Sequence, residues 1–394
     1  MKPVIVAVGY NRPALMKRLL DSVGRASYDC DDVHLIVSID ESNRSDEVEQ
    51  VAREFQWNHG TKEIRRFPER QGLRKHIVQC GDYSEKYGAV IILEDDLVVS
   101  EDFYSYVCQA HEKYSDDERI CGVALYSYKR IQFTGYRFDP VSTPYDAFLG
   151  GMVVTWGQSW TAKQWGSFKS WYLAHEDKLP AVNHAIPEEI SSWNRSWGKY
   201  FASYMAETGR YYIYPYAAHT TCFAELGEHS VNAIPLTCVQ VPLMTGRKKY
   251  VFGDYEQLPR YDSFYERVLD DSVNIHGIPG SQICMDLGGM KHNTLGKKYV
   301  ITGSELPHQR LASFALAMKP AEMNVLRDLP GTAFNLYELS QPAEDIRPPK
   351  KKPYAYELNH MRLRYEHVDM PLRSSIYYSL HELWLRLRIK LKLK

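Results

Sequence analysis

Three consecutive acidic residues, Glu94, Asp95 and Asp96, directly follow a run of apolar and small residues at 89–93. A buried strand over that run would carry all three carboxylates to the end of a sheet, where they repel one another unless a cation lies among them. Mn²⁺ and Mg²⁺ take oxygen ligands and often bind through one or two carboxylates together with substrate phosphates. The triplet therefore predicts a Mn²⁺ or Mg²⁺ site. The alternative is a solvated acidic turn that caps a helix beginning near Glu101.

Polar residues also follow the other short β-branched runs in the first third of the chain. Asn11 and Arg12 come after one such run, and Asp40 comes after the next. Strands are predicted at 4–8, 33–39, 64–67 and 89–93, alternating with helices at 14–23, 46–55 and 73–87. This order predicts an α/β fold with a mostly parallel sheet and helices on both of its faces. Such sheets bind ligands beyond the carboxyl ends of their strands, where these polar residues lie.

Six ordered blocks of sequence carry a resemblance to a known family. They read VIVAVGYNRPALMKRLL, LIVSIDES with QGLRKHI, VIILEDDLVVSEDFYSY, FLGGMVVTW, SSWNRSW and TTCFAELGEHS. In this order they resemble the GT-A glycosyltransferases of the family 2 type, and among these the N-acetylglucosaminyltransferase I type with its EDD metal motif. The resemblance runs from about residue 3 to residue 232. It implies a GT-A fold, Rossmann-like with a mostly parallel sheet, and a nucleotide-sugar donor such as a UDP-sugar.

Carried over to this chain, the resemblance assigns roles around the acidic triplet. Asp96 would be the direct metal ligand, and Asp95 would lie against the ribose or the water shell of the metal. Glu94 would face the donor sugar. Asp40 would contact the ribose or base of the nucleotide.

Four further residues have assignments that compete with simpler alternatives. Asn11 and Arg12 would lie beside the nucleotide, although Arg12 has the position of an ordinary surface residue at a helix start. Lys75 would balance diphosphate charge, and its alternative is a solvated helix face. His229, in a late loop of the resembled pattern, would be a second metal ligand, with a structural or solvated histidine as the alternative.

The catalytic base is the point on which this chain departs from the resembled pattern. An inverting transferase needs a carboxylate that accepts the acceptor hydroxyl's proton. Where the family supplies an aspartate, this chain has Asn194, which cannot accept one. Glu189 is the preferred candidate, with Glu188 beside it and Asp177 farther upstream. Acidic residues at a helix start explain the glutamate pair equally well.

Composition and the later sequence set the remaining expectations. The 394 residues are 44% hydrophobic and 25% charged with a net charge of −1, which fits a globular protein and argues against bulk nucleic-acid binding. Seven scattered cysteines favour a reducing, cytoplasmic setting. The predicted organisation is a catalytic domain at 1–240, an accessory α/β region at 241–345 and a tail at 346–394. In the accessory region strands are expected at 298–302 and 334–339, and helices at 311–318 and 321–326.

The tail combines a basic linker with a helical apolar stripe. RPPKKKP at 347–353 predicts an extended, exposed segment, and the last nine residues contain five Lys or Arg. The stripe consists of apolar side chains at helical spacing, namely Ile376, Leu380, Leu383, Trp384, Leu387 and Leu391. A helix of this kind suits an anionic membrane surface, and its alternatives are docking on the protein's own core or a frayed end.

The sequence thus predicts a divalent-metal-dependent, inverting glycosyltransferase. It would act on a glycan or lipid-linked acceptor in polysaccharide biosynthesis, in the cytoplasm and peripherally at the inner face of a membrane. Two other classes stay open: a nucleotidyltransferase, which should carry a glycine-rich phosphate loop after the first strand, and a catalytically inactive GT-A-like binding protein.

Overall fold

The fold comes from a computed structural model of the whole chain. The structure describes residues 1–30, 32–134, 136–180, 182–194, 196–223, 240–340 and 346, and in the tail 376–377, 379–380, 383–384 and 387. The chain divides into two compact units, of which unit 1 holds residues 1–129 and 138–269, and unit 2 holds residues 130–137 and 270–394.

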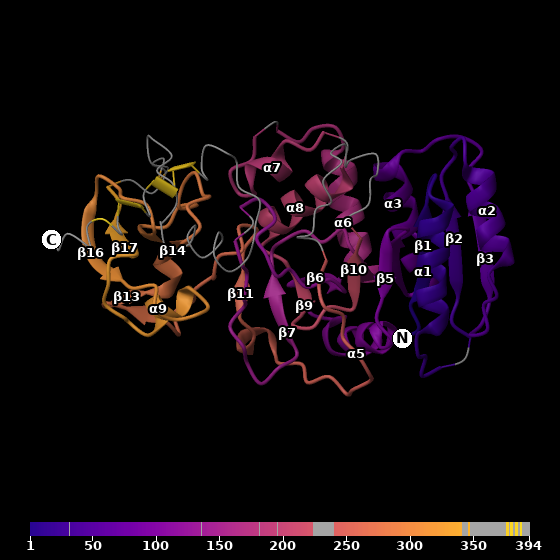
Figure 1. The fold of residues 1–394 in the computed structure, drawn as a ribbon, viewed down its shortest axis with the longest axis horizontal. Helices are drawn as coiled ribbons and strands as arrows, with labels where there is room; N and C mark the ends of the chain where they lie inside the picture. The colour runs from indigo at the N-terminus through magenta and orange to yellow at the C-terminus, as the bar shows by residue number, and fades with distance from the viewer. Residues whose placement is uncertain are drawn as a thin grey trace. The chain divides into compact units, whose positions relative to one another are not determined.

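A nine-stranded sheet forms the centre of unit 1 in the described residues (Figure 1). Its order is β11-β7-β9-β6-β8-β4-β1-β2-β3. The strands, in chain order, are β1 (Val4–Gly9), β2 (Leu35–Ile39), β3 (Lys62–Arg66), β4 (Ala89–Glu94), β6 (Ile120–Ala124), β7 (Ala147–Gly150), β8 (Gln158–Thr161), β9 (Tyr211–Pro215) and β11 (Arg260–Tyr261). The pairs around β1 are parallel, as are β6 with β9 and β7 with β11, whereas β8 pairs antiparallel with both β4 and β6. The predicted α/β class with a mostly parallel sheet is confirmed.

Helices follow most of the strands, as the alternating pattern predicts. Those of unit 1 are α1 (Pro13–Arg25), α2 (Ser45–Glu54), α3 (Leu73–Gly81), α4 (Tyr83–Tyr87), α5 (Phe103–Tyr114), α6 (Ala162–His175), α7 (Glu188–Ser191) and α8 (Trp197–Thr208). The helix expected at 73–87 is two helices, because the chain turns at Asp82. The carboxylate of Asp82 accepts hydrogen bonds from Trp165 Nε1 at 2.8 Å and from Lys169 Nζ, both on α6.

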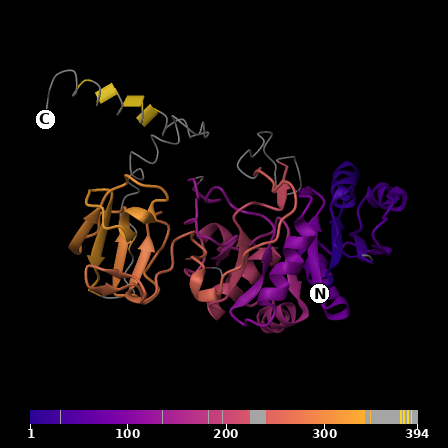
Figure 2. The same cartoon turned by 90° about the horizontal axis from the view of Figure 1, so that it is seen from below.

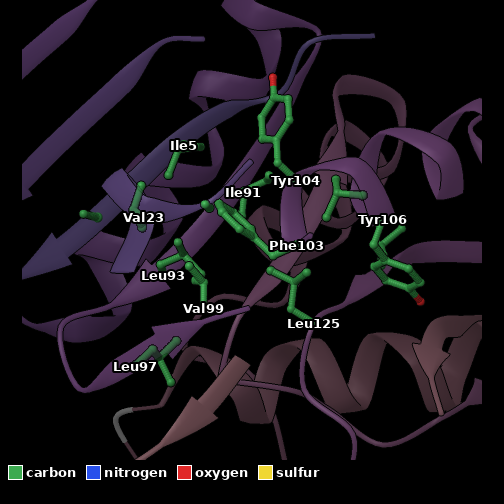
Figure 3. Close-up of a cluster of buried hydrophobic side chains, with 14 of the residues drawn as sticks. Ile5, Val23, Ile91, Leu93, Leu97, Val99, Phe103, Tyr104, Tyr106 and Leu125 are labelled. Carbon is green, nitrogen blue, oxygen red and sulfur yellow. The ribbon is translucent and has the colours of Figure 1, made fainter. Parts of the chain in front are cut away.

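Both faces of the central strands are buried, which explains why their sequences read as unbroken apolar runs. Ile5 and Ala7 of β1 belong to a core cluster that also contains Phe103 of α5. Val4 and Val6 point to the opposite face, since side chains alternate along a strand, and they are buried as well. Figure 3 shows side chains of this cluster from β1, β4 and α5. Their packing holds β4 in place, the strand whose last residue is Glu94 of the acidic triplet.

Buried histidines hold helices and loops to this sheet through serine hydroxyls. His76 of α3 is hydrogen bonded to Ser38 of β2 at 2.8 Å, and His111 of α5 to Ser159 of β8 at 2.7 Å. Burial lowers the pKa of His76 to about 4 and that of His111 to about 3. Both rings are therefore neutral at pH 7, and the hydrogen bond to serine satisfies one ring nitrogen of each.

Residues 241–269 still belong to unit 1 and pack against its sheet and helices. Lys248 N and the Tyr250 hydroxyl donate to the buried carboxylate of Asp102, and Lys248 Nζ lies 2.6 Å from Asp146. The short strand β11 then pairs with β7, and a 3₁₀ turn at Tyr255–Gln257 precedes it. Unit 1 thus continues to residue 269, past the expected limit at 240, while the functional division into domains stays a prediction.

Unit 2 contains a four-stranded sheet of order β14-β15-β17-β16 (Figure 2). The elements of unit 2, in chain order, are β12 (Asn274–Ile275), β13 (Ile278–Pro279), a 3₁₀ turn (Gly280–Gln282), β14 (Ile283–Asp286), β15 (Tyr299–Thr302), β16 (Gln309–Phe314), α9 (Glu322–Leu326) and β17 (Phe334–Glu338). The strands expected at 298–302 and 334–339 and the helix expected at 321–326 are present. The helix expected at 311–318 is wrong, because residues 309–314 pair antiparallel with β17 as an edge strand. Backbone pairing there outweighs the helix propensity of Leu, Ala and Met.

Candidate functional site

The acidic triplet lies at the carboxyl end of a central strand. Glu94 ends β4 and is in register with Val8 of the parallel strand β1. Asp95 and Asp96 form the turn to β5 (Leu97–Val99), which pairs with β10 (Thr220–Cys222). Asp95 is buried and Asp96 is partly exposed. The apolar run of β4 thus carries three adjacent carboxyl groups to the edge at which such sheets bind ligands.

Arg12 is the cation that meets these carboxylates. Its Nη2 donates to Asp95 Oδ1 and, over 3.2 Å, to Asp96 Oδ2. Burial lowers the pKa of the Arg12 guanidinium, but attraction to Asp95 and Asp96 outweighs it and leaves that pKa above its ordinary value. The structure therefore joins the end of β1 to the end of β4 through one guanidinium.

The carboxyl groups remain short of positive charge. Burial raises the pKa of Asp95 to about 6, opposed by Arg12 and reinforced by Asp96. Burial, followed by the charges of Asp96 and Asp95, raises the pKa of Glu94 well above its ordinary value. If all three carboxyls were ionised, they and one guanidinium would together carry a formal charge of −2, and the raised pKa values of Glu94 and Asp95 reflect the cost of that charge. A divalent cation at this place would neutralise it.

Two buried oxygen atoms test whether a metal suits the site. Among the residues that the structure describes, Asp95 Oδ2 and Asp96 Oδ1 have no hydrogen-bond partner. Buried carboxylate oxygens seldom stay unpaired, and these two are of the type that Mn²⁺ and Mg²⁺ prefer. Across the described parts of the chain, no three His, Cys, Asp or Glu side chains form a ready-made metal site. Asp95 and Asp96 therefore suit a metal that takes its other ligands from substrate phosphates and water.

Asp40 lies at the end of β2 and holds the loop that leads into α3. Its Oδ1 accepts hydrogen bonds from the backbone N–H groups of Glu41 and Gln71, and its Oδ2 accepts one from Gly72. Gly72 has a φ of 75°, a conformation that favours glycine. The carboxylate thus shapes the loop at the carboxyl edge whether or not it also contacts a nucleotide.

On α3 the basic side chain that makes contacts is Arg74, whereas the sequence predicted a role for Lys75. Lys75 is exposed on α3, whereas its neighbour Arg74 is half-buried. Arg74 Nη1 donates to the Tyr200 hydroxyl at 2.8 Å and to Asp177 Oδ1 at 3.0 Å. The sequence analysis missed Arg74. Arg74 and Lys75 are adjacent basic residues in the first turn of α3, so the sequence alone gave no reason to prefer Lys75.

The three base candidates differ in their surroundings. Asp177 has a positive φ of 57°, and its carboxylate is engaged by Arg74. Glu188 and Glu189 are the first two residues of α7 and are exposed. Asn194 lies between α7 and α8, in the turn where the resembled pattern has its aspartate. Asp177 thus has a guanidinium partner, and the choice of base stays a prediction.

His229 lies outside the described residues, but both flanks of its segment are described. Phe223 N donates to the backbone oxygen of Asp96 at 3.3 Å, and the guanidinium of Arg18 stacks over the Phe223 ring at 3.8 Å. Val241 N donates to Thr221 Oγ1 at 2.9 Å. The last described residue before this stretch, Phe223, therefore lies beside the acidic triplet, and Val241 after it is bonded to Thr221 of β10.

One family model matches part of this chain. The sequence model of the family described as glycosyl transferase family 2 matches residues 4–154, from β1 to just beyond β7. The match includes the acidic triplet, Arg12 and Asp40. No curated protein matches the chain.

Several solved structures match part of this chain at low sequence identity and low TM-score. S. aureus TarS 1–349 is 14% identical with a TM-score of 0.36, over 56% of this chain and 60% of that one. The mannosyltransferase PcManGT from Pyrobaculum calidifontis, in complex with GDP-Man and Mn²⁺, is 13% identical with a TM-score of 0.34, over 55% of each chain. GalNAc-T7 with UDP, GalNAc and Mn²⁺ is 13% identical with a TM-score of 0.39, over 60% of this chain and 45% of that one. This chain thus spans less than two thirds of each of these structures, and TM-scores below 0.5 do not establish a shared fold.

Proposed function

We propose that this protein is a GT-A glycosyltransferase of the family 2 type that transfers a hexose or N-acetylhexosamine from a UDP-sugar. The observation that carries the proposal is the pair of buried, unpartnered oxygens on Asp95 and Asp96, at a strand end that lies within the family match. A scaffold that only binds other proteins has no need for carboxylates that are short of positive charge at the edge of a sheet.

In this proposal, one group of residues binds the metal and the donor diphosphate. Asp96 holds the divalent metal, with His229 as a second ligand, and Asp95 lies toward the metal and the ribose. A bound Mn²⁺ or Mg²⁺ supplies Lewis-acid stabilisation of the departing diphosphate. Arg12 adds positive charge on the same side, as does Lys75.

The nucleotide and the acceptor take the remaining roles. Asp40 contacts the nucleotide and Asn11 lies beside it, while Glu94 faces the donor sugar. Glu189 accepts the proton of the acceptor hydroxyl as it attacks the anomeric carbon in line with the leaving group. Attack from the face opposite the diphosphate inverts the anomeric configuration.

The nucleotidyltransferase alternative loses support at the loop after β1. That class needs a glycine-rich loop whose backbone approaches phosphates, and here no glycine lies between Gly9, the last residue of β1, and Pro13. A Cβ on Gly9 would lie 2.5 Å from Met16 Cε, so packing against α1 already explains this glycine.

Donor hydrolysis separates the candidate functions. We expect slow release of UDP from a UDP-sugar in the presence of Mn²⁺, and loss of that release in EDTA, because transferases leak donor to water. A nucleotidyltransferase would instead form a UDP-sugar and pyrophosphate from UTP and a sugar 1-phosphate. A binding protein would do neither. Release of UDP that continues unchanged in EDTA would contradict the metal dependence.

We also propose that the acceptor is a glycan or lipid-linked glycan of polysaccharide biosynthesis, met at an anionic membrane surface on the cytoplasmic side. Every helix in the described residues is too short or too polar to span a bilayer. Beyond residue 375, the described apolar residues are all helical and 47–62% exposed, namely Ile376, Tyr377, Leu380, Leu383, Trp384 and Leu387. Their helical spacing gives one apolar face, and the basic residues that follow complement anionic lipid.

Truncation before Ser374 is expected to release the protein from vesicles of anionic lipid without removing activity on soluble acceptors. Each basic residue near the surface contributes about 1 kcal/mol to binding. Co-sedimentation of full-length and truncated chains measures the effect. A full-length variant with Gln at the five basic residues of the last nine separates charge from the apolar face. Equal partition of intact and truncated chains would refute the membrane role.

A further inference from the structure

The backbone of Arg12 is held in a fixed conformation by the proline that follows it, while its side chain extends to the acidic triplet. It lies between Asn11 and Pro13, and Pro13 is the first residue of α1. The residue before a proline is held away from helical conformation, and Arg12 has φ −121° and ψ 74°. Any movement of its guanidinium must therefore come from side-chain rotation.

The contact of Arg12 with the carboxylates is incomplete on both sides. The hydrogen bonds to Asp95 and to Asp96 both come from the nitrogen Nη2. A guanidinium that binds a carboxylate permanently commonly uses two nitrogens in a parallel fork. On the acidic side, Asp95 Oδ2 and Asp96 Oδ1 have no hydrogen-bond partner within the described parts of the chain. The Arg12 side chain is 25% exposed, so it borders solvent from which a ligand could approach.

We propose that Arg12 is an exchangeable counter-ion, which holds Asp95 and Asp96 in the free enzyme and moves to the donor diphosphate when a divalent cation binds. The inference rests on the proposed function. It adds that cation binding displaces Arg12 first and that Arg12 then contacts the diphosphate. Arg12 and the cation compete for the same two carboxylates. The displaced guanidinium then meets phosphate oxygens, which match its planar donor geometry.

This competition predicts opposite effects of one substitution on two ligands. In Arg12→Gln, Mn²⁺ without nucleotide is expected to bind at least about tenfold more tightly than in the wild type, because no guanidinium must be displaced. UDP in saturating Mn²⁺ is expected to bind about tenfold more weakly, since a charge-assisted contact to phosphate is lost. A purely structural role would weaken both. Titration calorimetry measures both affinities without any turnover, and Arg25→Gln, an exposed arginine at the end of α1, is the matched control.

Two further measurements keep the test decisive. If Arg12→Gln folds poorly, its melting temperature should be low without Mn²⁺ and recover when Mn²⁺ is added. Arg12→Lys keeps one positive charge, so its Mn²⁺ affinity should stay near that of the wild type. Unchanged or weaker Mn²⁺ binding by Arg12→Gln overturns the exchange and leaves the transferase proposal standing. If neither protein binds Mn²⁺ without UDP, the exchange is overturned, and if neither binds it with UDP present either, the metal dependence is overturned as well.

Discussion

Asp96→Ala is expected to remove sugar transfer while the protein keeps its fold. Asp96 is partly exposed, and one of its carboxylate oxygens has no partner, so the side chain contributes little to packing. Its proposed role is to hold the metal that stabilises the leaving diphosphate. Loss of one such stabilising group in other enzymes costs about 10² to 10³ in rate, and loss of the metal itself should cost at least as much. Initial rates of transfer with Mn²⁺ measure the effect, with thermal melts as the check on folding.

The control for this variant is an acidic residue in a similar ion pair outside the site. Asp21 on α1 lies 2.8 Å from Lys17 and is exposed, so Asp21→Asn should retain full activity. Because Asp95 still binds Arg12 in Asp96→Ala, the variant should not leave the guanidinium without a partner. Wild-type rates in Asp96→Ala, with or without added metal, would contradict the central assignment.

Glu189→Gln is expected to lower turnover by about 10² to 10⁴, the usual contribution of a general base. Glutamine keeps the shape and hydrogen bonding of the side chain but cannot accept the proton. Glu189 lies in the first turn of α7, where loss of its charge costs about 0.3–1 kcal/mol of helix stability, too little to unfold the protein. Donor affinity should change little, so the loss should fall on kcat.

Glu188→Gln and Asp177→Asn are the comparisons for this variant in the same assay. Asp177 is engaged by Arg74, so its substitution should alter that contact and have a smaller effect on turnover. If Glu189→Gln keeps normal turnover while one of the others collapses, the base is reassigned to that residue. If all three stay active, the anomeric configuration of the product has to be determined, because an inverting reaction would then lack its base.

The central strands could be predicted from the sequence because burial on both faces leaves an unmistakable pattern. Runs such as 4–8 and 89–93 contain almost only apolar residues, and parallel strands under two layers of helices require this. The strand at 309–314 could not be predicted. Its residues favour a helix locally, and only pairing with 334–338, distant in sequence, makes them a strand. The return of residues 248–250 to Asp102 likewise depends on contacts that no local pattern reveals.

The candidate site divides in the same way. Strand ends identify Arg12, Asp40 and the acidic triplet, because topology brings the carboxyl ends of neighbouring parallel strands together. Which groups then meet depends on side-chain geometry. The sequence assigned Arg12 and Asp40 to the nucleotide, but it did not predict that Arg12 would bind both aspartates. Nor did it predict that Asp40 would hold the backbone of Gln71 and Gly72.

The anchors on either side of residues 224–239 bear on the length of chain between them. Because Val241 N is hydrogen bonded to Thr221, the chain comes back to the strand that it left, and the ends of the intervening segment are fixed independently of its sequence. Doubling the length of a flexible closed loop costs only about 0.6 kcal/mol in closure entropy. By the entropy of loop closure alone, a longer chain between Phe223 and Val241 would therefore add only a small cost. Since Phe223 lies beside Asp96, a change of chain length between these two described flanks would begin next to the acidic triplet.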